Sequence, residues 1–238
     1  MLLSNINIPK HIAIIMDGNR RWAKTRGKIS IFGHRKGVQS AKRAIEFAIT
    51  NNFNTLTLYA FSSENWNRSI SEVKSLMDLF KYSLKNGIYN LHSKKVKLKI
   101  IGDKSKFEKT LKKLIYSSEK LTKNNNGLNL NIAINYGGRW DIIQGIKKII
   151  NRVQKGLIHP NQINEQTLCQ VISMNDLDPV DLVIRTGGEY RISNFLLWQI
   201  AYSELFFTDV LWPDFDENTF FNAIKFFSQR NRRFGTTK

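Results

Sequence analysis

The feature that most constrains this fold is a regular alternation between short apolar runs and longer amphipathic segments. The apolar runs are rich in β-branched and aromatic residues, which is typical of buried strands, and they occupy residues 12–16, 55–61, 96–101, 128–135, 180–184 and 205–208. Between them, apolar residues recur at helical spacing, and helices are predicted at residues 33–52, 69–86, 105–124, 140–153, 195–202 and 218–227. This alternation favours an α/β fold with a mostly parallel central sheet of about six strands and helices on both faces.

One domain, residues 1–238, is expected, because the chain has no Pro- or Ser-rich linker and 42% of it is hydrophobic. The single cysteine, Cys169, excludes a disulfide framework and fits a reducing compartment, for which the cytoplasm is the default. No run approaches the ~20 apolar residues of a membrane span, and residues 1–10 lack the apolar stretch of a signal peptide. The net charge of +18 favours an anionic partner, such as a phosphorylated substrate, an acidic lipid surface or a nucleic acid.

A carboxylate surrounded by cations follows the first predicted strand. Asp17, Gly18 and Asn19 come directly after the apolar run, at the end where open α/β sheets bind their ligands, and a glycine there permits close backbone approach. The cations that follow are Arg20, Arg21, Lys24 and Arg26. This cluster predicts a phosphate-like anion with a divalent metal between it and Asp17. The alternative is a helix start in which Asp17 and Asn19 are caps and the cations form a solvated face.

Two further polar loops are predicted at the same edge of the sheet. The second strand is followed by the polar stretch from Ser62 to Arg68, and the fifth is followed by Arg185 and Arg191 on either side of a Gly-Gly pair. Guanidinium groups match phosphate oxygens in two-point contacts, so this last loop is predicted to bind an anion rather than to form surface ion pairs. His34 stands in the basic region after the first strand, where it either contacts an anion or ends a helix.

Common nucleotide and metal motifs are absent from the sequence. There is no GxxxxGK[ST] loop, no GxGxxG fingerprint, no HExxH motif and no Cys/His cluster. Nucleoside-triphosphate hydrolysis, dinucleotide redox chemistry and a protein-bound zinc site therefore lack their usual signatures. Two anion loops on neighbouring strand ends instead predict a pair of substrates that each carry phosphate, with a metal between them.

Long motifs spread over nearly the whole chain resemble a known family. They read HIAIIMDGNRRW, GHRKG, LTLYAFSSENWNR, NYGGRWD, DLVIRTGGEYRISNFLLWQIAYSE and LFFTDVLWPDF, in that order. On these motifs the chain resembles the cis-prenyltransferases, and most closely the bacterial undecaprenyl diphosphate synthases. The resemblance implies a homodimeric, Mg²⁺-dependent α/β enzyme that adds isopentenyl diphosphate units to farnesyl diphosphate. Its product would be a long polyprenyl diphosphate for the lipid carrier of cell-wall synthesis, grown in an apolar substrate tunnel.

The resemblance also implies roles for individual residues. Asp17 and Asn65 correspond to catalytic residues, and Asp17 with Glu204 to the carboxylates associated with Mg²⁺. The implied substrate-binding residues are Arg185, Arg191 and Ser193 for isopentenyl diphosphate, and Gly18, Asn19, Arg20, Arg21, Trp22, His34, Ser62, Ser63, Glu64, Trp66 and Arg68 for the allylic diphosphate and the mobile loop. Glu72, which begins the following helix with Ser69 in a capping box, belongs to the same loop.

The implied tunnel would be lined by an apolar stripe on the helix at 69–86, by Ala60 near its middle and by Leu128 near its closed end. The stripe comprises Leu76, Met77 and Phe80, and its other interpretation is ordinary core. The resemblance places the segment around Trp212 near a subunit interface and directs residues 232–235 toward the partner's active site. It also suggests a peripheral membrane contact for product release and no nucleic-acid partner.

The sequence departs from the family pattern at Ser30, where relatives usually have an arginine that contacts the allylic diphosphate. Arg20 or Arg26 would have to replace that contact. An RNA-binding module would also explain the charge, but aromatic stacking platforms should then recur on a sheet face or loop. A trans-type prenyl synthase would use the same substrates, but it is all-helical with DDxxD repeats; Asp214 and Asp216 are predicted to cap the last helix instead.

Overall fold

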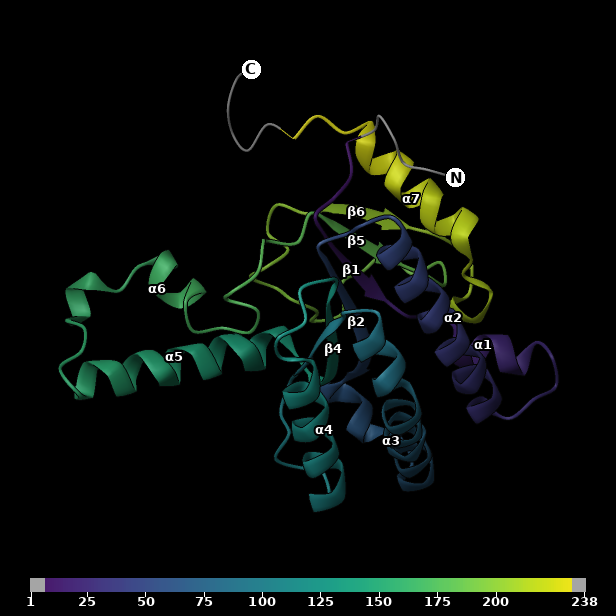
Figure 1. The fold of residues 1–238 in the computed structure, drawn as a ribbon, viewed down its shortest axis with the longest axis horizontal. Coiled ribbons are helices and arrows are strands. Elements are labelled where there is room, and N and C mark those ends of the chain that lie inside the picture. The colour runs from purple at the N-terminus through teal and green to yellow at the C-terminus, as the bar shows by residue number, and fades with distance from the viewer. Residues whose placement is uncertain (1–6, 233–238) are drawn as a thin grey trace.

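Six parallel strands form the central sheet of the structure, a computed structural model that describes residues 7–232 (Figure 1). The strands are β1 His11–Ile15, β2 Thr55–Ser62, β3 Lys97–Ile101, β4 Asn129–Tyr136, β5 Leu182–Arg185 and β6 Glu204–Phe207. Their order across the sheet is β3-β4-β2-β1-β5-β6, and each of these pairings is parallel. The predicted parallel α/β fold is therefore confirmed, and each strand boundary lies within two residues of its predicted position.

Helices separate most of the strands along the chain. They are α1 Asn19–Lys24, α2 Ser30–Thr50, α3 Ile70–Ser93, α4 Lys109–Thr122, α5 Gly138–Gln154, α6 Glu165–Cys169 and α7 Glu217–Ser228, with short 3₁₀ helices at η1 Ser63–Asn67, η2 Pro160–Gln162 and η3 Trp212–Asp214. Ser69 caps α3 as predicted, because its hydroxyl accepts a hydrogen bond from the Glu72 backbone N–H at 3.3 Å. Within residues 7–232, no helix combines the length and apolar character needed to span a bilayer.

The two faces of the sheet carry different layers. Side chains alternate along β1, so Ile12 and Ile14 face one layer and Ala13 and Ile15 face the other. The first layer contains α2, α3, α4 and α7. The second contains the segment 174–200 and the start of α5, which extends away from the sheet toward α6 (Figure 1). The core therefore lies on both sides of the strands, and their carboxyl ends remain free to form a site.

Two predictions about helices are wrong. Helix α3 continues to Ser93 instead of ending near residue 86, because Ile88 and Leu91 extend its apolar side beyond Gly87. The predicted helix at residues 195–202 is a series of turns. Asn194 and Leu196 have φ values of +60° and +44°, which a right-handed helix cannot contain. The apolar residues of this segment are buried because they cover the second face of the sheet, not because they form a helix.

Candidate functional site

A cleft of about 940 Å³ opens at the carboxyl edge of the sheet, where the loops after β1, β2 and β5 meet. It brings together most of the residues predicted from the sequence: Asp17, Gly18, Asn19, Arg20, Arg21, His34, Ser62, Asn65, Arg68, Arg185, Arg191 and Ser193. Its lining contains seven lysines and arginines but only two carboxylates. The excess positive charge suits a ligand with several negative charges, such as a diphosphate.

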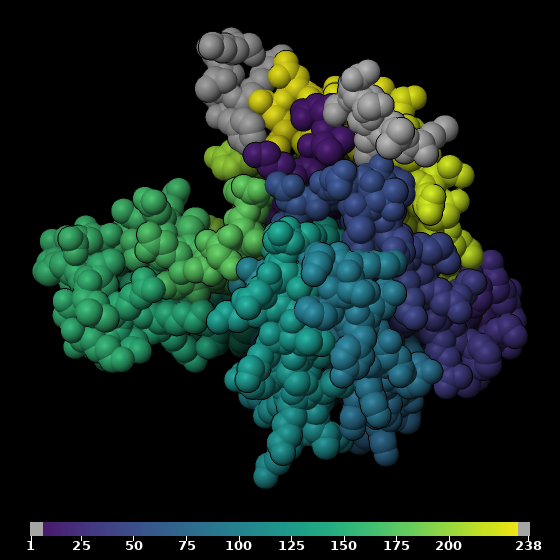
Figure 2. Space-filling model, in the orientation of Figure 1, coloured from purple at the N-terminus to yellow at the C-terminus, as the bar shows by residue number. Residues whose placement is uncertain are grey.

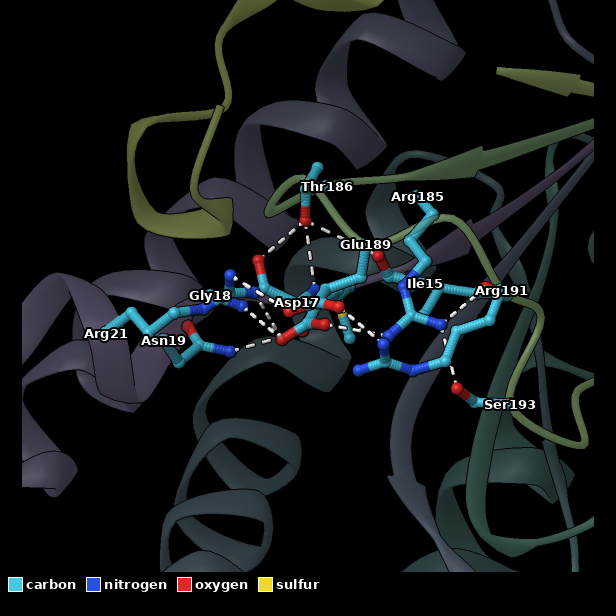
Figure 3. Close-up of polar contacts among 11 residues, drawn as sticks. Ile15, Asp17, Gly18, Asn19, Arg21, Arg185, Thr186, Glu189, Arg191 and Ser193 are labelled. Atoms are coloured by element: carbon cyan, nitrogen blue, oxygen red, sulfur yellow. Dashed lines mark hydrogen bonds and ion pairs between the residues drawn. The ribbon is translucent and has the colours of Figure 1, made fainter. Parts of the chain in front are cut away.

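Asp17 lies at the centre of this cleft, between cations from two loops (Figure 3). Its Oδ2 accepts a hydrogen bond from Arg185 Nη2 at 2.8 Å, and its Oδ1 lies 3.3 Å from Arg21 Nη2. The Arg185 side chain is only 4% exposed, whereas the Asp17 side chain is 30% exposed. Arg185 is held further by Ser193 Oγ at 2.8 Å and by the Arg191 carbonyl. Asp17 therefore balances a buried guanidinium and also presents a carboxylate to the cleft.

The backbone around Asp17 is fixed by Thr186 and by two glycines. The Asp17 N–H donates to Thr186 Oγ1 at 3.0 Å, and the same hydroxyl donates to the Asp17 carbonyl at 2.8 Å. Gly18 has φ +108°, and a Cβ there would lie 2.8 Å from a Leu211 methyl group. Gly187 has φ +88°, and a Cβ there would lie 2.7 Å from Arg21 Nη2. Both positions therefore require glycine: Gly18 lets the loop after β1 approach the segment after β6, and Gly187 lets the loop after β5 approach the loop after β1.

Glu189 is a cleft residue that the sequence analysis did not single out. Its Oε1 lies 3.3 Å from Arg21 Nη1, and its Oε2 pairs with Arg191. It thus joins the loop after β1 to the loop after β5. The sequence pattern that could have indicated Glu189 is a carboxylate between two arginines in the stretch RTGGEYR. At this spacing the carboxylate can pair with the cations of a predicted anion site.

Several buried polar atoms in the cleft have no hydrogen-bond partner. They are Asn19 Oδ1, Ser30 Oγ, His34 Nε2 and Arg185 Nε, all from residues that line the cleft. Burial lowers the pKa of His34 to about 4, and the Arg68 and Arg20 charges add to this effect, so its imidazole is neutral at pH 7. Unpartnered buried polar groups are costly, so these atoms indicate a place where ligand oxygens complete the hydrogen bonding.

Arg20, rather than Arg26, brings a cation to the region of Ser30. Arg20 lines the cleft, and its Nε lies 3.9 Å from the Glu72 carboxylate, which also accepts a 3.1 Å hydrogen bond from Arg68. Arg26 instead stacks 4.3 Å from the centre of the Trp22 ring and pairs with Asp214 at 3.2 Å. Relatives usually have an arginine at the position of Ser30, and Arg20 and Arg26 are the two predicted replacements. Of these two, only Arg20 lies in the cleft.

Five predicted site residues do not line the cleft: Trp22, Ser63, Glu64, Trp66 and Glu204. Trp22 donates from Nε1 to Asp214 Oδ1 at 2.7 Å, so Asp214 is not a helix cap, whereas Asp216 does cap α7. Glu204 lies beside Leu182 at the amino end of β5, opposite to the Arg185 end, and pairs with Arg230 at 3.1 Å. Within one chain, Glu204 and Asp17 therefore do not form a joint metal site.

The remaining three residues lie in η1 or at its start and hold that segment in place. Trp66 Nε1 donates to Asn135 Oδ1 at 2.7 Å, and Glu64 accepts from Asn194 Nδ2 at 2.8 Å. Ser63 Oγ donates to Glu64 at 3.1 Å. Because these contacts attach η1 to β4 and to the loop after β5, they position Ser62, Asn65 and Arg68, the members of the segment that do reach the cleft.

An apolar cavity of about 500 Å³ lies next to the cleft, between α2, α3 and the sheet. The two share lining residues, namely Met16, Asn19, His34, Ala60, Phe61 and Leu76, so they adjoin each other along a common wall. Met77 and Phe80 also line the cavity, as predicted. Leu128 does not: it is buried just before β4, and the residues of that strand that line the cavity are Leu130, Ile132 and Ile134.

The cleft suits a metal held partly by its substrate. Within residues 7–232 there is no group of three or more His, Cys, Asp or Glu side chains that could form an all-protein metal cage. Mg²⁺ is commonly bound by one or two carboxylates together with substrate phosphates and water. Asp17, which is partly exposed among phosphate-binding cations, fits that arrangement.

Comparison with known proteins agrees with this geometry. Residues 15–235 match the family described as putative undecaprenyl diphosphate synthase. The ditrans,polycis-undecaprenyl-diphosphate synthase of Wigglesworthia glossinidia brevipalpis, named as (2E,6E)-farnesyl-diphosphate specific, is 67% identical over 98% of this chain and 90% of its own length. The enzyme of the same name from Escherichia coli is 58% identical over 96% of this chain and 90% of its own length.

Solved structures show the same fold. Lavandulyl diphosphate synthase from Lavandula x intermedia, in complex with dimethylallyl diphosphate, superposes with a TM-score of 0.93 at 38% identity, over 96% of this chain and 98% of its own. A probable undecaprenyl diphosphate synthase from Campylobacter jejuni superposes with a TM-score of 0.81 at 35% identity, over 97% of this chain and all of its own. This chain therefore belongs to the undecaprenyl diphosphate synthase family of prenyltransferases.

Proposed function

We propose that this protein is a Mg²⁺-dependent cis-prenyltransferase that condenses isopentenyl diphosphate repeatedly onto farnesyl diphosphate to make undecaprenyl diphosphate for the cell-wall lipid carrier. The observation that carries this proposal is the adjacency of a cationic cleft and an apolar cavity, which share lining residues. A substrate with a diphosphate head and an isoprenoid tail needs both environments in contact. The names of the relatives at 58–67% identity support the same substrate and product.

The two diphosphates are assigned to different sides of Asp17. The allylic diphosphate lies near Asn19, Arg21 and His34, because these residues border the apolar cavity or its entrance and two of them offer unpartnered polar atoms. Isopentenyl diphosphate lies near Arg191 and Ser193, which line the cleft but not the cavity. This arrangement directs the allylic tail into the cavity and leaves the five-carbon substrate in the open part of the cleft.

In each cycle the allylic C–O bond and one C–H bond of isopentenyl diphosphate break, one C–C bond forms, and diphosphate and a proton are released. The allylic C–O bond breaks and its electron pair leaves with the diphosphate, whose developing charge is stabilised by Arg21, Arg20 and the neutral His34 as a hydrogen-bond donor. The double bond of isopentenyl diphosphate supplies the electrons of the new C–C bond, and loss of a proton restores an alkene. Mg²⁺ bound at Asp17 would further neutralise the departing diphosphate. Asn65 lies in the cleft, where its amide can orient either substrate.

The proposed enzyme is a cytoplasmic homodimer. The segment around Trp212 stays the interface that the resemblance implies; the Trp212 side chain itself is 1% exposed and donates to the Gly37 carbonyl within the same chain. Helix α5 offers an apolar surface as well, since Ile143, Ile146 and Ile150 are exposed along one side of it. A second chain is also required for Glu204 to join Asp17 at a metal. Residues 233–235, predicted to reach the partner, lie outside the described residues.

The proposal is tested by incubating the protein with farnesyl diphosphate, labelled isopentenyl diphosphate and Mg²⁺, followed by mass analysis of the products. An undecaprenyl product that disappears with EDTA supports it, and absence of any elongated product contradicts it. Arg191→Ala should raise KM for isopentenyl diphosphate by roughly 10-fold, the loss of about one charge-assisted hydrogen bond, with a smaller effect on farnesyl diphosphate. The control is Arg35→Ala, which replaces an exposed arginine outside the cleft and should change the KM for neither substrate.

A further inference from the structure

Two asparagines with a left-handed backbone contact η1, the short helix beside the cleft. Asn135, near the carboxyl end of β4, has φ +50°, and Asn194, in the loop after β5, has φ +60°. A positive φ is uncommon for residues other than glycine, although asparagine tolerates it better than most. Such conformations persist only where surrounding contacts hold them, and they cluster at functional sites. The contacts of these two side chains therefore bear on the cleft.

Asn135 joins η1 to the turn after β3. Its Oδ1 accepts a hydrogen bond from Trp66 Nε1 at 2.7 Å, and its Nδ2 donates to the Asp103 carbonyl at 2.7 Å. The Asp103 N–H in turn donates to the Asn135 carbonyl at 3.0 Å. Asn135 is only 4% exposed, so both ends of its amide are committed to these partners. The turn after β3 thus helps to hold η1, although Asp103 itself does not line the cleft.

Trp66 is held from two further sides. The Phe61 ring meets the indole edge to face, with 5.5 Å between the ring centres, and Lys106 Nζ lies 5.4 Å from the centre of the indole. Lys106 also belongs to the turn after β3, which leads into α4. Figure 2 shows α3, in blue-green, and α4, in teal, forming one protruding lobe of the molecule. The indole is therefore fixed against a packed part of the protein.

Asn194 makes a corresponding link from the other loop. Its Nδ2 donates to Glu64 Oε1 at 2.8 Å, and its Oδ1 accepts from the Arg139 N–H at 3.0 Å. Its backbone carbonyl accepts from the Gly138 N–H at 2.6 Å. Each asparagine thus uses its amide oxygen, its amide nitrogen and its backbone carbonyl. Together they attach η1 at Glu64 and at Trp66, two positions apart.

The periodicity of η1 explains why these two attachments matter to the cleft. A 3₁₀ helix has three residues per turn, so residues three apart lie on the same side. Ser62, Asn65 and Arg68 have this spacing, and all three line the cleft. Glu64 and Trp66 do not line it, and they contact the asparagines instead. A rotation of η1 would therefore move all three cleft residues together.

We propose that Asn135 and Asn194 are positioning residues for prenyl transfer, because they fix the rotation of η1 and so aim Asn65 and Arg68 at the substrates. This inference rests on the proposed function and deepens it. Neither asparagine lines the cleft, so each acts through η1. Loss of either link should lower turnover more than it raises KM for farnesyl diphosphate, whose proposed site lies on α1 and α2.

The kinetic test uses Asn135→Gly, because glycine keeps a positive φ accessible and removes only the amide. The kcat of the first condensation should fall about tenfold, the upper range for one lost hydrogen bond, and KM for farnesyl diphosphate should change less than about twofold. Asn194→Gly should act in the same direction. The control is Asn52→Gly, the same substitution at φ +56° in an exposed residue before β2, at the opposite edge of the sheet. It should change neither constant, and an equal loss of kcat there would overturn the proposal.

A double-mutant cycle tests whether Asn135 acts through Trp66. Trp66→Phe keeps an aromatic ring but removes the indole N–H that Asn135 accepts. If the hydrogen bond carries the effect, Asn135→Gly combined with Trp66→Phe should turn over no more slowly than the slower single variant. Losses of kcat that multiply in the double variant would show two independent effects and would overturn the assignment.

Amide hydrogen exchange across residues 62–68, measured without substrate, gives a readout that does not depend on activity. Exchange should be about tenfold faster in Asn135→Gly than in wild type and unchanged in Asn52→Gly. Equal exchange in Asn135→Gly and wild type would overturn the attachment of η1. If wild type forms no elongated product while exchange follows the expected order, the proposed function fails and the attachment of η1 by the asparagines stands.

Discussion

The cleft and the apolar cavity share a wall but are built in different ways. The cleft is held by ion pairs between loops distant in sequence, such as Asp17 with Arg185 and Arg21 with Glu189. The cavity is bounded by apolar sides of α2 and α3 that face the sheet, and its lining contains few charges. Ion pairs therefore fix the cleft, the proposed diphosphate site, where a small displacement changes hydrogen bonding. Apolar packing shapes the cavity, the proposed site of the isoprenoid tail, where volume matters most.

The largest effect is expected at the centre of the cleft, from Asp17→Ala. Turnover should fall on the order of 10³-fold, because the substitution removes the carboxylate available to Mg²⁺ and releases Arg185. The free energy of unfolding should also fall, by about 1–3 kcal/mol, because the buried Arg185 loses its ionic partner although Asp17 itself is partly exposed. Steady-state kinetics and urea unfolding measure the two effects separately.

A second variant separates the structural role of Asp17 from the catalytic one. Asp17→Ala combined with Arg185→Met removes both charges, so stability should return toward that of the wild type while turnover stays low. If the single variant retained near-normal turnover with Mg²⁺, Asp17 would be only a partner for Arg185. The cleft would then differ from the cavity in how it is built, but Asp17 would have no catalytic role in it.

Substitutions in the cavity should change product length with smaller effects on the first condensation. Ala60 lines both the cleft and the cavity, so Ala60→Leu should narrow the passage and shorten the products by several isoprene units. Leu130→Ala should enlarge the cavity and lengthen the products, at a stability cost of about 2–5 kcal/mol. Chromatography of labelled products measures both shifts.

Leu128→Ala is the matched control for Leu130→Ala. Both leucines are buried, 4% exposed at Leu128 and fully buried at Leu130, but only Leu130 lines the cavity. The control should lose comparable stability and leave the product lengths unchanged. If both substitutions changed product length equally, stability rather than cavity shape would control termination.

The smallest effect is expected from pH, through His34 at the boundary between the two regions. Its pKa of about 4 in the folded protein lies below the unfolded value of 6.5, so the unfolded state binds more protons between these values. The stability contributed by neutral His34 is complete above about pH 6.5 and is lost as the pH falls toward 4. The stability of wild type relative to His34→Gln should therefore fall by about 2 kcal/mol from pH 7.5 to pH 5.

Urea unfolding at the two pH values measures this change. His11 also has a pKa lowered by burial, but it is present in both proteins and cancels in the comparison. A difference between wild type and His34→Gln that stays constant with pH would show that His34 titrates normally. In that case it would carry a positive charge in the cleft at pH 5, in contradiction to the burial found in the structure.

The sequence by itself determined the strands, most helices and the meeting of the cationic loops at one edge of the sheet. Period-two and helical spacings of apolar residues are local signals, and parallel strands place their carboxyl ends at one edge, so Asp17, Arg68 and Arg185 had to lie near one another. The family motifs added the prediction of which ligands bind there. The helix predicted at residues 195–202 was wrong, because the apolar residues of this buried segment have the spacing of a helix although its backbone has positive φ values.

Only the tertiary structure decided which polar groups reach the ligand and which serve the scaffold. Trp22 and Arg26 are bound by Asp214, almost two hundred positions away, and Glu204 lies at the opposite end of its strand from the cleft. The choice of Leu130 over Leu128 as a cavity residue likewise depends on where α2 and α3 cross the sheet. Such outcomes are set by distances between segments remote in sequence, and neither residue type nor spacing along the chain encodes those distances directly.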